Sequence, residues 1–242
     1  MKKKFWRFNG NEEKYLKSIL YKGFKQKKGP FSSQLEKKWS SIHKIKYSIC
    51  INSCTSALHI AFKSIGIKNG DEVIVPALTP IMCGTTVSFC GGTPVYADVN
   101  PYNFLIDPFD VEKKITKKTK AILAVHMYSG VCNLKQLKKI CNKNKIFLIE
   151  DCAESVGAKD ENNIITGTAG DISCWSFQSA KQLTCGDGGI LSTNSKKLGK
   201  KIRQFSNLGF KTLTAASNQI IISKNKRQNP NYKRFTEIGL NY

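Results

Sequence analysis

Ile149-Glu150-Asp151-Cys152-Ala153-Glu154 and Ser176-Phe177-Gln178-Ser179-Ala180-Lys181 are the stretches that decide the fold of this 242-residue chain. The first is the end of an apolar run typical of a buried strand, and it places Asp151 at the carboxyl end of that strand. The second places Lys181 just beyond another such run. Ligands of open α/β sheets bind at the carboxyl ends of the strands. The two stretches therefore predict an α/β sheet with a candidate site at that edge.

The flanking sequence extends this pattern. Between about residues 45 and 205, apolar runs alternate with amphipathic segments, which predicts a mostly parallel sheet of roughly seven strands flanked by helices. A turn is expected at Asn69-Gly70, and Pro80 and Pro108 are expected to begin helices. The expected strands are 47–51, 72–76, 94–97, 121–125, 146–149, 172–177 and 189–192, and the expected helices of this part are 55–65, 80–89, 108–115, 134–142 and 196–207.

Three segments follow from this organisation. Residues 1–45 form an N-terminal helical segment, with helices over 12–21 and 32–40 and a break at Gly29-Pro30. Residues 46–210 form the large α/β domain. Residues 211–242 begin as a polar, aperiodic stretch and end with the start of an apolar element at Ile238, so we expect that a further domain is missing.

Composition limits the class of protein. Hydrophobic residues make up 40 % and charged residues 23 % of the chain, which is typical of a globular protein. No apolar run reaches the roughly 18 residues of a membrane span. The first residues, Met1-Lys2-Lys3-Lys4, are not followed by the apolar segment of a signal peptide. We therefore expect a cytoplasmic protein without a membrane partner.

The net charge of +22 would suit a nucleic-acid binder. However, arginine supplies most bidentate contacts to bases and phosphates, and the chain has only Arg7, Arg203, Arg227 and Arg234. The lysines are spread along the whole sequence. We therefore expect no nucleic-acid partner, and the alternative predicts salt-sensitive binding to DNA.

The nine cysteines show no C-x-x-C pair. Several stand inside apolar runs, where a thiol behaves as a small hydrophobic group. His43, His59 and His126 have no metal-ligand spacing with any cysteine. Reduced, buried cysteines and no metal site are the expectation.

The candidate site has chemical and purely structural interpretations. An Asp and a partly desolvated Lys at neighbouring strand ends could clamp a planar cofactor that carries an aldehyde and a ring nitrogen. Alternatively, the Asp is a helix cap and the Lys is a surface residue. The small hydroxylated residues 52–56 precede a helix and could bind a phosphate, or form an ordinary N-cap. The run from Gly186 to Gly189 fits a tight turn equally well.

Taken together, these segments resemble the DegT/DnrJ/EryC1/StrS family of sugar aminotransferases, which use pyridoxal 5′-phosphate on a fold type I scaffold. The resemblance spans nearly the whole chain in the family's order. It rests on residues 52–58, 70–77, 92–95 with Asp98, 149–158, Gly167 with Gly170-Asp171, 176–181, 186–189 and 239–242.

The resemblance implies a role for each matching residue. The catalytic residue would be Lys181, which holds the coenzyme as an imine and then moves a proton. Asp151 would pair with the pyridine nitrogen, and Glu154 would lie near the ring oxygen, where many members carry Gln or His. The phosphate would be held by Thr55, Ser56, Ser176 and, from the neighbouring subunit of a dimer with shared sites, Asn241.

The implied protein is the large domain of an enzyme that transfers an amino group, with glutamate as donor, to a nucleotide-activated keto-sugar for surface polysaccharide or glycan biosynthesis. The family continues beyond Tyr242 into a smaller domain. Pro80 stands where relatives carry an aromatic residue over the ring, so another side chain such as Met82 would cover it. The alternative is a catalytically inactive remnant, or half of a split gene, that binds the coenzyme or a partner chain.

Overall fold

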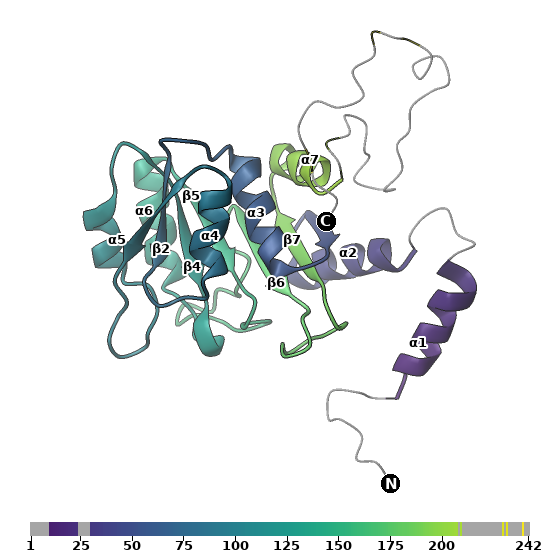
Figure 1. The fold of residues 1–242 in the computed structure, drawn as a ribbon. Coiled ribbons are helices and arrows are strands. Elements are labelled where there is room, and N and C mark those ends of the chain that lie inside the picture. The colour runs from purple at the N-terminus through teal and green to yellow at the C-terminus, as the bar shows by residue number, and fades with distance from the viewer. Residues whose placement is uncertain are drawn as a thin grey trace.

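The computed structural model describes residues 10–23 and 30–207, and in addition the single residues 209, 229, 231 and 239. Its centre is a seven-stranded sheet with the order β1-β7-β6-β5-β4-β2-β3 (Figure 1). The strands are β1 Tyr47–Ile51, β2 Glu72–Pro76, β3 Thr93–Ala97, β4 Thr119–Val125, β5 Phe147–Asp151, β6 Ile172–Ser176 and β7 Gly189–Thr193.

The pairing of the strands is mostly parallel. β3, β2, β4, β5 and β6 form a continuous parallel set, and β7 is antiparallel to both of its neighbours, β6 and β1. In the parallel set the carboxyl ends of the strands therefore lie along one edge of the sheet. This arrangement confirms the predicted fold class.

Helices cover both faces of the sheet. The helices of this part are α3 Cys54–Ile65, α4 Met82–Phe89, α5 Pro108–Lys114, α6 Leu134–Asn144 and α7 Lys196–Phe205, with a short 3₁₀ turn at Met127–Ser129. Apolar residues of α3, α4 and α7 share one buried cluster with the sheet. Those of α5 and α6 belong to a second cluster on the opposite face. The molecule is thus a three-layer α/β/α structure.

Alternation along the strands assigns each side chain to a face. In β4, Leu123 packs in the cluster of α3 and α4, whereas Ile122 packs in that of α5 and α6. In β5, Ile149 belongs to the first face. Asp151 shares that face, and the intervening Glu150 points to the other. Two consecutive carboxylates therefore lie on opposite sides of the sheet.

The N-terminal helices are α1 Glu12–Ser18, which continues into a π-helical turn at Ile19–Gly23, and α2 Pro30–His43. In Figure 1, α1 lies away from the sheet, beyond α2. α2 packs on the sheet through Trp39, which joins a third apolar cluster with Trp175. A buried ion pair ties α2 to α7: the Arg203 guanidinium meets the Glu36 carboxylate at 2.7 and 2.9 Å.

The expected element boundaries agree with the structure to within a few residues. The second N-terminal helix begins at Pro30, so the position expected to break the chain is instead the first residue of a helix. Pro108 begins α5 as predicted, with Asp107 as its N-cap. Pro80 does not begin α4: its carbonyl accepts from the Cys83 N–H at 3.0 Å, which closes a tight turn just before the helix. Almost all of the segment 211–242 lies outside the described residues.

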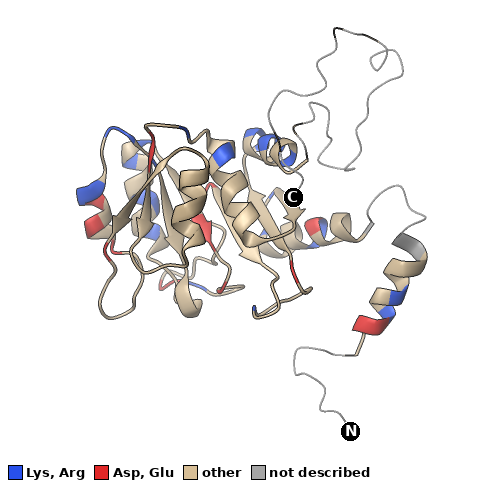
Figure 2. Cartoon of the chain, viewed as in Figure 1, with Lys and Arg blue, Asp and Glu red and all other residues tan. Residues whose placement is uncertain are grey.

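The cysteines, all within the described ranges, are free thiols. Seven are buried as expected, while Cys50 is partly buried and Cys185 is exposed. Lys and Arg are spread over helices at opposite ends of the sheet, including α5 and α7 (Figure 2). Within the described part of the chain, no helix combines the length and the apolar character that crossing a membrane requires.

Candidate active site

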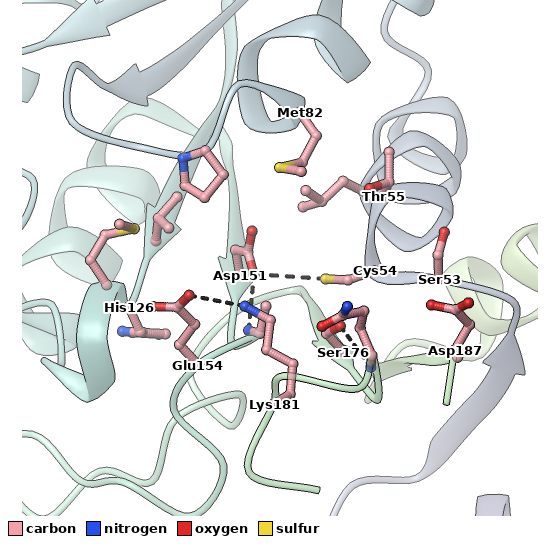
Figure 3. A pocket seen from close by; sticks show the side chains of 17 residues that line it. Ser53, Cys54, Thr55, Met82, His126, Asp151, Glu154, Ser176, Lys181 and Asp187 are labelled. Atoms are coloured by element: carbon pink, nitrogen blue, oxygen red, sulfur yellow. Dashed lines mark hydrogen bonds and ion pairs between the residues drawn. The ribbon is translucent and has the colours of Figure 1, made fainter. Parts of the chain in front are cut away.

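A cavity of about 420 Å³ opens where β4, β5 and β6 end and α3 and α4 begin. Figure 3 shows the side chains of Asp151, Glu154 and Lys181 at one side of it and those of Thr55 and Met82 at the other. Its lining includes Ser53, Cys54, Thr55, Pro80, Met82, His126, Asp151, Glu154, Ser176, Gln178, Lys181 and Asp187. The site thus lies at the edge of the sheet predicted from the sequence.

Asp151 ends β5 and is only 5 % exposed. Its Oδ1 accepts from the Ala153 N–H at 3.0 Å. Its other partners are the thiols of Cys54, 3.7 Å from Oδ1, and Cys83, 3.4 Å from Oδ2. Among the described residues no Lys or Arg forms an ion pair with it. Burial raises the pKa of this carboxyl group, because it disfavours the charged form.

Lys181 lies in the loop after β6 and reaches back to the loop after β5. Its Nζ donates to Glu154 Oε1 at 2.9 Å, and the two side chains are 24 % and 30 % exposed. The Tyr128 N–H donates to the other oxygen of Glu154. Although burial pushes it upward, these two donors hold the pKa of Glu154 below its usual value. The amine is therefore held at the cavity by a carboxylate that stays ionised.

The N-terminus of α3 forms another wall. Ser53 is the N-cap: its Oγ accepts from the Ser56 N–H at 3.1 Å and donates to Ser56 Oγ at 3.0 Å. Thr55 is exposed to the cavity. Gly189, the first residue of β7, passes so close that a Cβ there would lie 2.6 Å from the Ser53 carbonyl. The glycine run therefore has a steric reason at this position: it allows β7 to start against the beginning of α3.

The structure brings together most of the residues that the sequence predicts for the site. Thr55, Asp151, Glu154, Ser176 and Lys181 line the same cavity. Ser56 is buried and does not line it, and its N–H and hydroxyl bond to Ser53 in the cap of α3. Asn241 lies outside the described residues. The roles assigned to these residues remain predictions.

Sequence reasoning missed several side chains of the cavity wall. Cys54 and Gln178 stand inside the two stretches that were singled out, but only their neighbours were assigned a role. His126 directly follows β4, so the strand-end rule that found Asp151 could also have found it. Pro80 and Met82, which the sequence analysis did name, also line the cavity.

His126, Glu150 and Cys152 form a cluster that sequence spacing did not predict. Their ligand atoms lie within 4.8 Å of one another, and all three side chains are buried. The Cys132 N–H donates to His126 Nδ1, so Nε2 carries the proton and donates to Glu150 Oε2 at 3.2 Å. Glu150 also accepts from the backbone N–H groups of residues 167, 169 and 170. Hydrogen bonding accounts for this cluster without a metal ion.

Comparison with known proteins identifies relatives of this chain. The profile of the DegT/DnrJ/EryC1/StrS aminotransferase family matches residues 7–238. The chain is 37 % identical to the GDP-perosamine synthase of Vibrio cholerae over 201 residues. This aligned segment covers 83 % of this chain and 54 % of the relative. The GDP-perosamine synthase of Escherichia coli O157:H7 is 36 % identical over 200 residues, covering 83 % and 55 %. The chain spans about half the length of these curated relatives.

Solved structures show the same fold. NtdA from Bacillus subtilis, solved with the bound cofactor PMP, superposes with a TM-score of 0.81 and 32 % identity, and the match covers 97 % of this chain and 50 % of that one. An aminotransferase from Psychrobacter cryohalolentis has a TM-score of 0.82 and 27 % identity, covering 97 % and 58 %. These neighbours confirm the aminotransferase scaffold expected from the sequence.

Proposed function

The chain belongs to the DegT/DnrJ/EryC1/StrS aminotransferase family, and we propose that it carries the coenzyme site of a pyridoxal 5′-phosphate-dependent sugar aminotransferase. The enzyme would transfer an amino group from an amino acid, glutamate, to a nucleotide-activated keto-sugar for surface polysaccharide or glycan biosynthesis. The observation that carries this proposal is the cavity in which Asp151, buried and paired with no Lys or Arg of the described residues, shares a wall with the amine of Lys181.

The donor set of the cavity fits pyridoxal 5′-phosphate. A buried carboxylate suits a protonated ring nitrogen, and Asp151, which pairs with no Lys or Arg in the described part of the chain, is such a group. An amine suits an aldehyde, and Lys181 supplies it. Free N–H groups at a helix N-terminus suit a phosphate, and the first turn of α3 lies at the same cavity. When bound, the coenzyme supplies an electron sink for the carbanion formed at the substrate carbon.

Two residues handle protons in this scheme. The amine of Lys181 must be uncharged when it acts as a nucleophile, and Glu154 Oε1, 2.9 Å from Nζ, holds the side chain at the cavity. Lys181 Nζ would afterwards be the base that takes and returns the proton at the substrate carbon. Asp151 would keep the ring nitrogen protonated.

Other residues position the ligand. Thr55 and Ser176 would donate hydroxyl hydrogen bonds to the phosphate, because both line the cavity. Ser56 would contribute through the cap of α3, and Asn241 would act from the neighbouring subunit of a homodimer. Met82 and Pro80 would cover the ring. We place the enzyme in the cytoplasm, without a membrane or nucleic-acid partner.

Similarity to the GDP-perosamine synthases supports a nucleotide-linked keto-sugar as the amino acceptor. The acceptor can be tested by incubating the chain with glutamate, coenzyme and a nucleotide-linked 4-keto sugar, and following the amino-sugar by mass spectrometry. An amino-sugar product would support the full proposal. Coenzyme binding without any amino-sugar would contradict amino transfer by this chain and support the inactive remnant.

Reduction with borohydride in the presence of pyridoxal 5′-phosphate tests the coenzyme site. We expect a pyridoxyl adduct on Lys181, located by peptide mass spectrometry, and its loss in Lys181→Met. Lys138→Met is the matched control, because Lys138 also pairs with a carboxylate, Asp171, at 3.0 Å and is 33 % exposed, but lies outside the cavity. An adduct that is absent from Lys181, or spread evenly over surface lysines, would refute the proposal.

A further inference from the structure

Two thiols converge on the carboxylate of Asp151 from different helices. Cys54 is the first residue of α3, and its Sγ lies 3.7 Å from Oδ1. Cys83 is in the first turn of α4, and its Sγ lies 3.4 Å from Oδ2. Figure 3 shows the contact with Cys54 directly. Each thiol thus reaches a different oxygen of the same buried group.

The thiols are hydrogen-bond donors in this arrangement. Burial raises the pKa of Cys54 and of Cys83, and the nearby Asp151 carboxylate raises both further. Both side chains therefore stay protonated at neutral pH. A carboxylate can only accept, so each S–H donates to it.

These donors leave little freedom to the carboxylate. Its two oxygens offer about four acceptor positions. On Oδ1, the Ala153 N–H and the Cys54 thiol use two of them, and on Oδ2 the Cys83 thiol uses one. Contacts on both oxygens oppose rotation of the group about its Cβ–Cγ bond. Counting the donors of the described residues, one acceptor position on Oδ2 is left for a ligand.

We propose that Cys54 and Cys83 are positioning residues that hold Asp151 in one orientation and stabilise its anionic form until a cationic ligand arrives. The identity of that ligand, the protonated ring nitrogen of the coenzyme, rests on the proposed function. The two hydrogen bonds are independent of the proposed function. Weak, uncharged donors suit this task, because a Lys or Arg partner would neutralise the carboxylate before the coenzyme could.

A packing role for the same thiols predicts different behaviour. Both cysteines belong to the apolar cluster between the sheet and α3 and α4. If they only filled space, alanine and serine variants would behave alike, because both lose the volume of the sulfur. If they donate hydrogen bonds, the hydroxyl of serine would replace the thiol and alanine would not.

Infrared spectroscopy of the coenzyme-free chain tests the hydrogen bonds themselves. The difference between wild type and Cys83→Ala isolates the S–H stretching band of Cys83, and Cys54→Ala isolates that of Cys54. Repeating both differences in an Asp151→Asn background should move each band to higher wavenumber, because a neutral amide accepts more weakly. Bands that stay in place would overturn the proposal.

Cys141 provides the matched control. It is a buried thiol on the opposite face of the sheet, with its Sγ 3.7 Å from the Phe147 carbonyl oxygen. Its band, isolated with Cys141→Ala, should be unchanged by Asp151→Asn. An equal shift for Cys141 would show a general change of structure and would overturn the proposal.

Coenzyme affinity tests the consequence. We expect Cys83→Ala to weaken the binding of pyridoxal 5′-phosphate about three- to tenfold, as the loss of one hydrogen bond from a weak thiol donor implies. Cys83→Ser should bind within about twofold of wild type, and Cys141→Ala should bind like wild type. Alanine and serine variants with equal affinity would overturn the positioning role. If the wild-type chain binds no coenzyme, the proposed function fails, while the infrared result still decides the hydrogen bonds.

Discussion

Replacement of Glu150 by Gln should strongly destabilise the chain, because this buried carboxylate accepts four hydrogen bonds. Oε1 accepts from the N–H groups of Ala169 and Gly170, and Oε2 accepts from the Gly167 N–H and from His126 Nε2. The side chain is completely buried. Three of the bonds fix the loop that precedes β6 to the end of β5, and the fourth holds His126, the residue after β4, against the same carboxylate.

The magnitude follows from the geometry of the amide. A Gln side chain has one acceptor oxygen and one NH₂ group, so in either orientation its NH₂ faces two donors. His126 cannot adapt, because its Nδ1 already accepts from the Cys132 N–H at 3.2 Å. Two hydrogen bonds to a charged group are therefore lost, at about 1.5–3 kcal/mol each. The expected loss of about 3–6 kcal/mol is a large part of the roughly 5–15 kcal/mol that stabilises a domain.

Urea denaturation of the coenzyme-free chain, followed by tryptophan fluorescence, measures this loss. Glu112→Gln is the control. The Glu112 side chain is 42 % exposed and its carboxylate meets Lys143 at 3.3 Å, so the loss of this ion pair should cost less than about 1 kcal/mol. A Glu150→Gln free energy of unfolding within about 1 kcal/mol of wild type, with the same denaturant slope, would refute the reasoning.

Two further predictions concern the coenzyme-free chain. Burial raises the pKa of Asp151 above 3.8, so the folded state binds more protons than the unfolded state between the two pKa values. The free energy of unfolding should therefore fall as pH rises through that window, and Asp151→Asn should remove this fall. Melting temperatures of wild type and Asp151→Asn that change equally with pH would contradict this prediction. Gly167 has φ +85°, and an added Cβ would overlap the Trp175 indole, so Gly167→Ala should cost more than about 3 kcal/mol. Gly157→Ala, at φ +75° in open space, should cost about 1–2 kcal/mol, and equal urea midpoints for the two variants would contradict the steric argument.

The sequence alone was sufficient for the fold class and for the location of the site. Strand and helix patterns are local: apolar β-branched runs and amphipathic segments specify elements without knowledge of their partners. The strand-end rule then places Asp151 and Lys181 at one edge of the sheet. The structure confirms the seven strands and the common cavity.

Only the tertiary structure decided how individual side chains are used. Glu150 and Asp151 are neighbours in sequence, yet alternation along β5 turns one into a structural acceptor on the far face and the other into the carboxylate of the cavity. Cys54 and Cys83 contact Asp151 only because α3 and α4 begin at the edge of the sheet where β5 ends. Such contacts join residues far apart in the chain, and no local pattern encodes them, because they depend on how the layers pack.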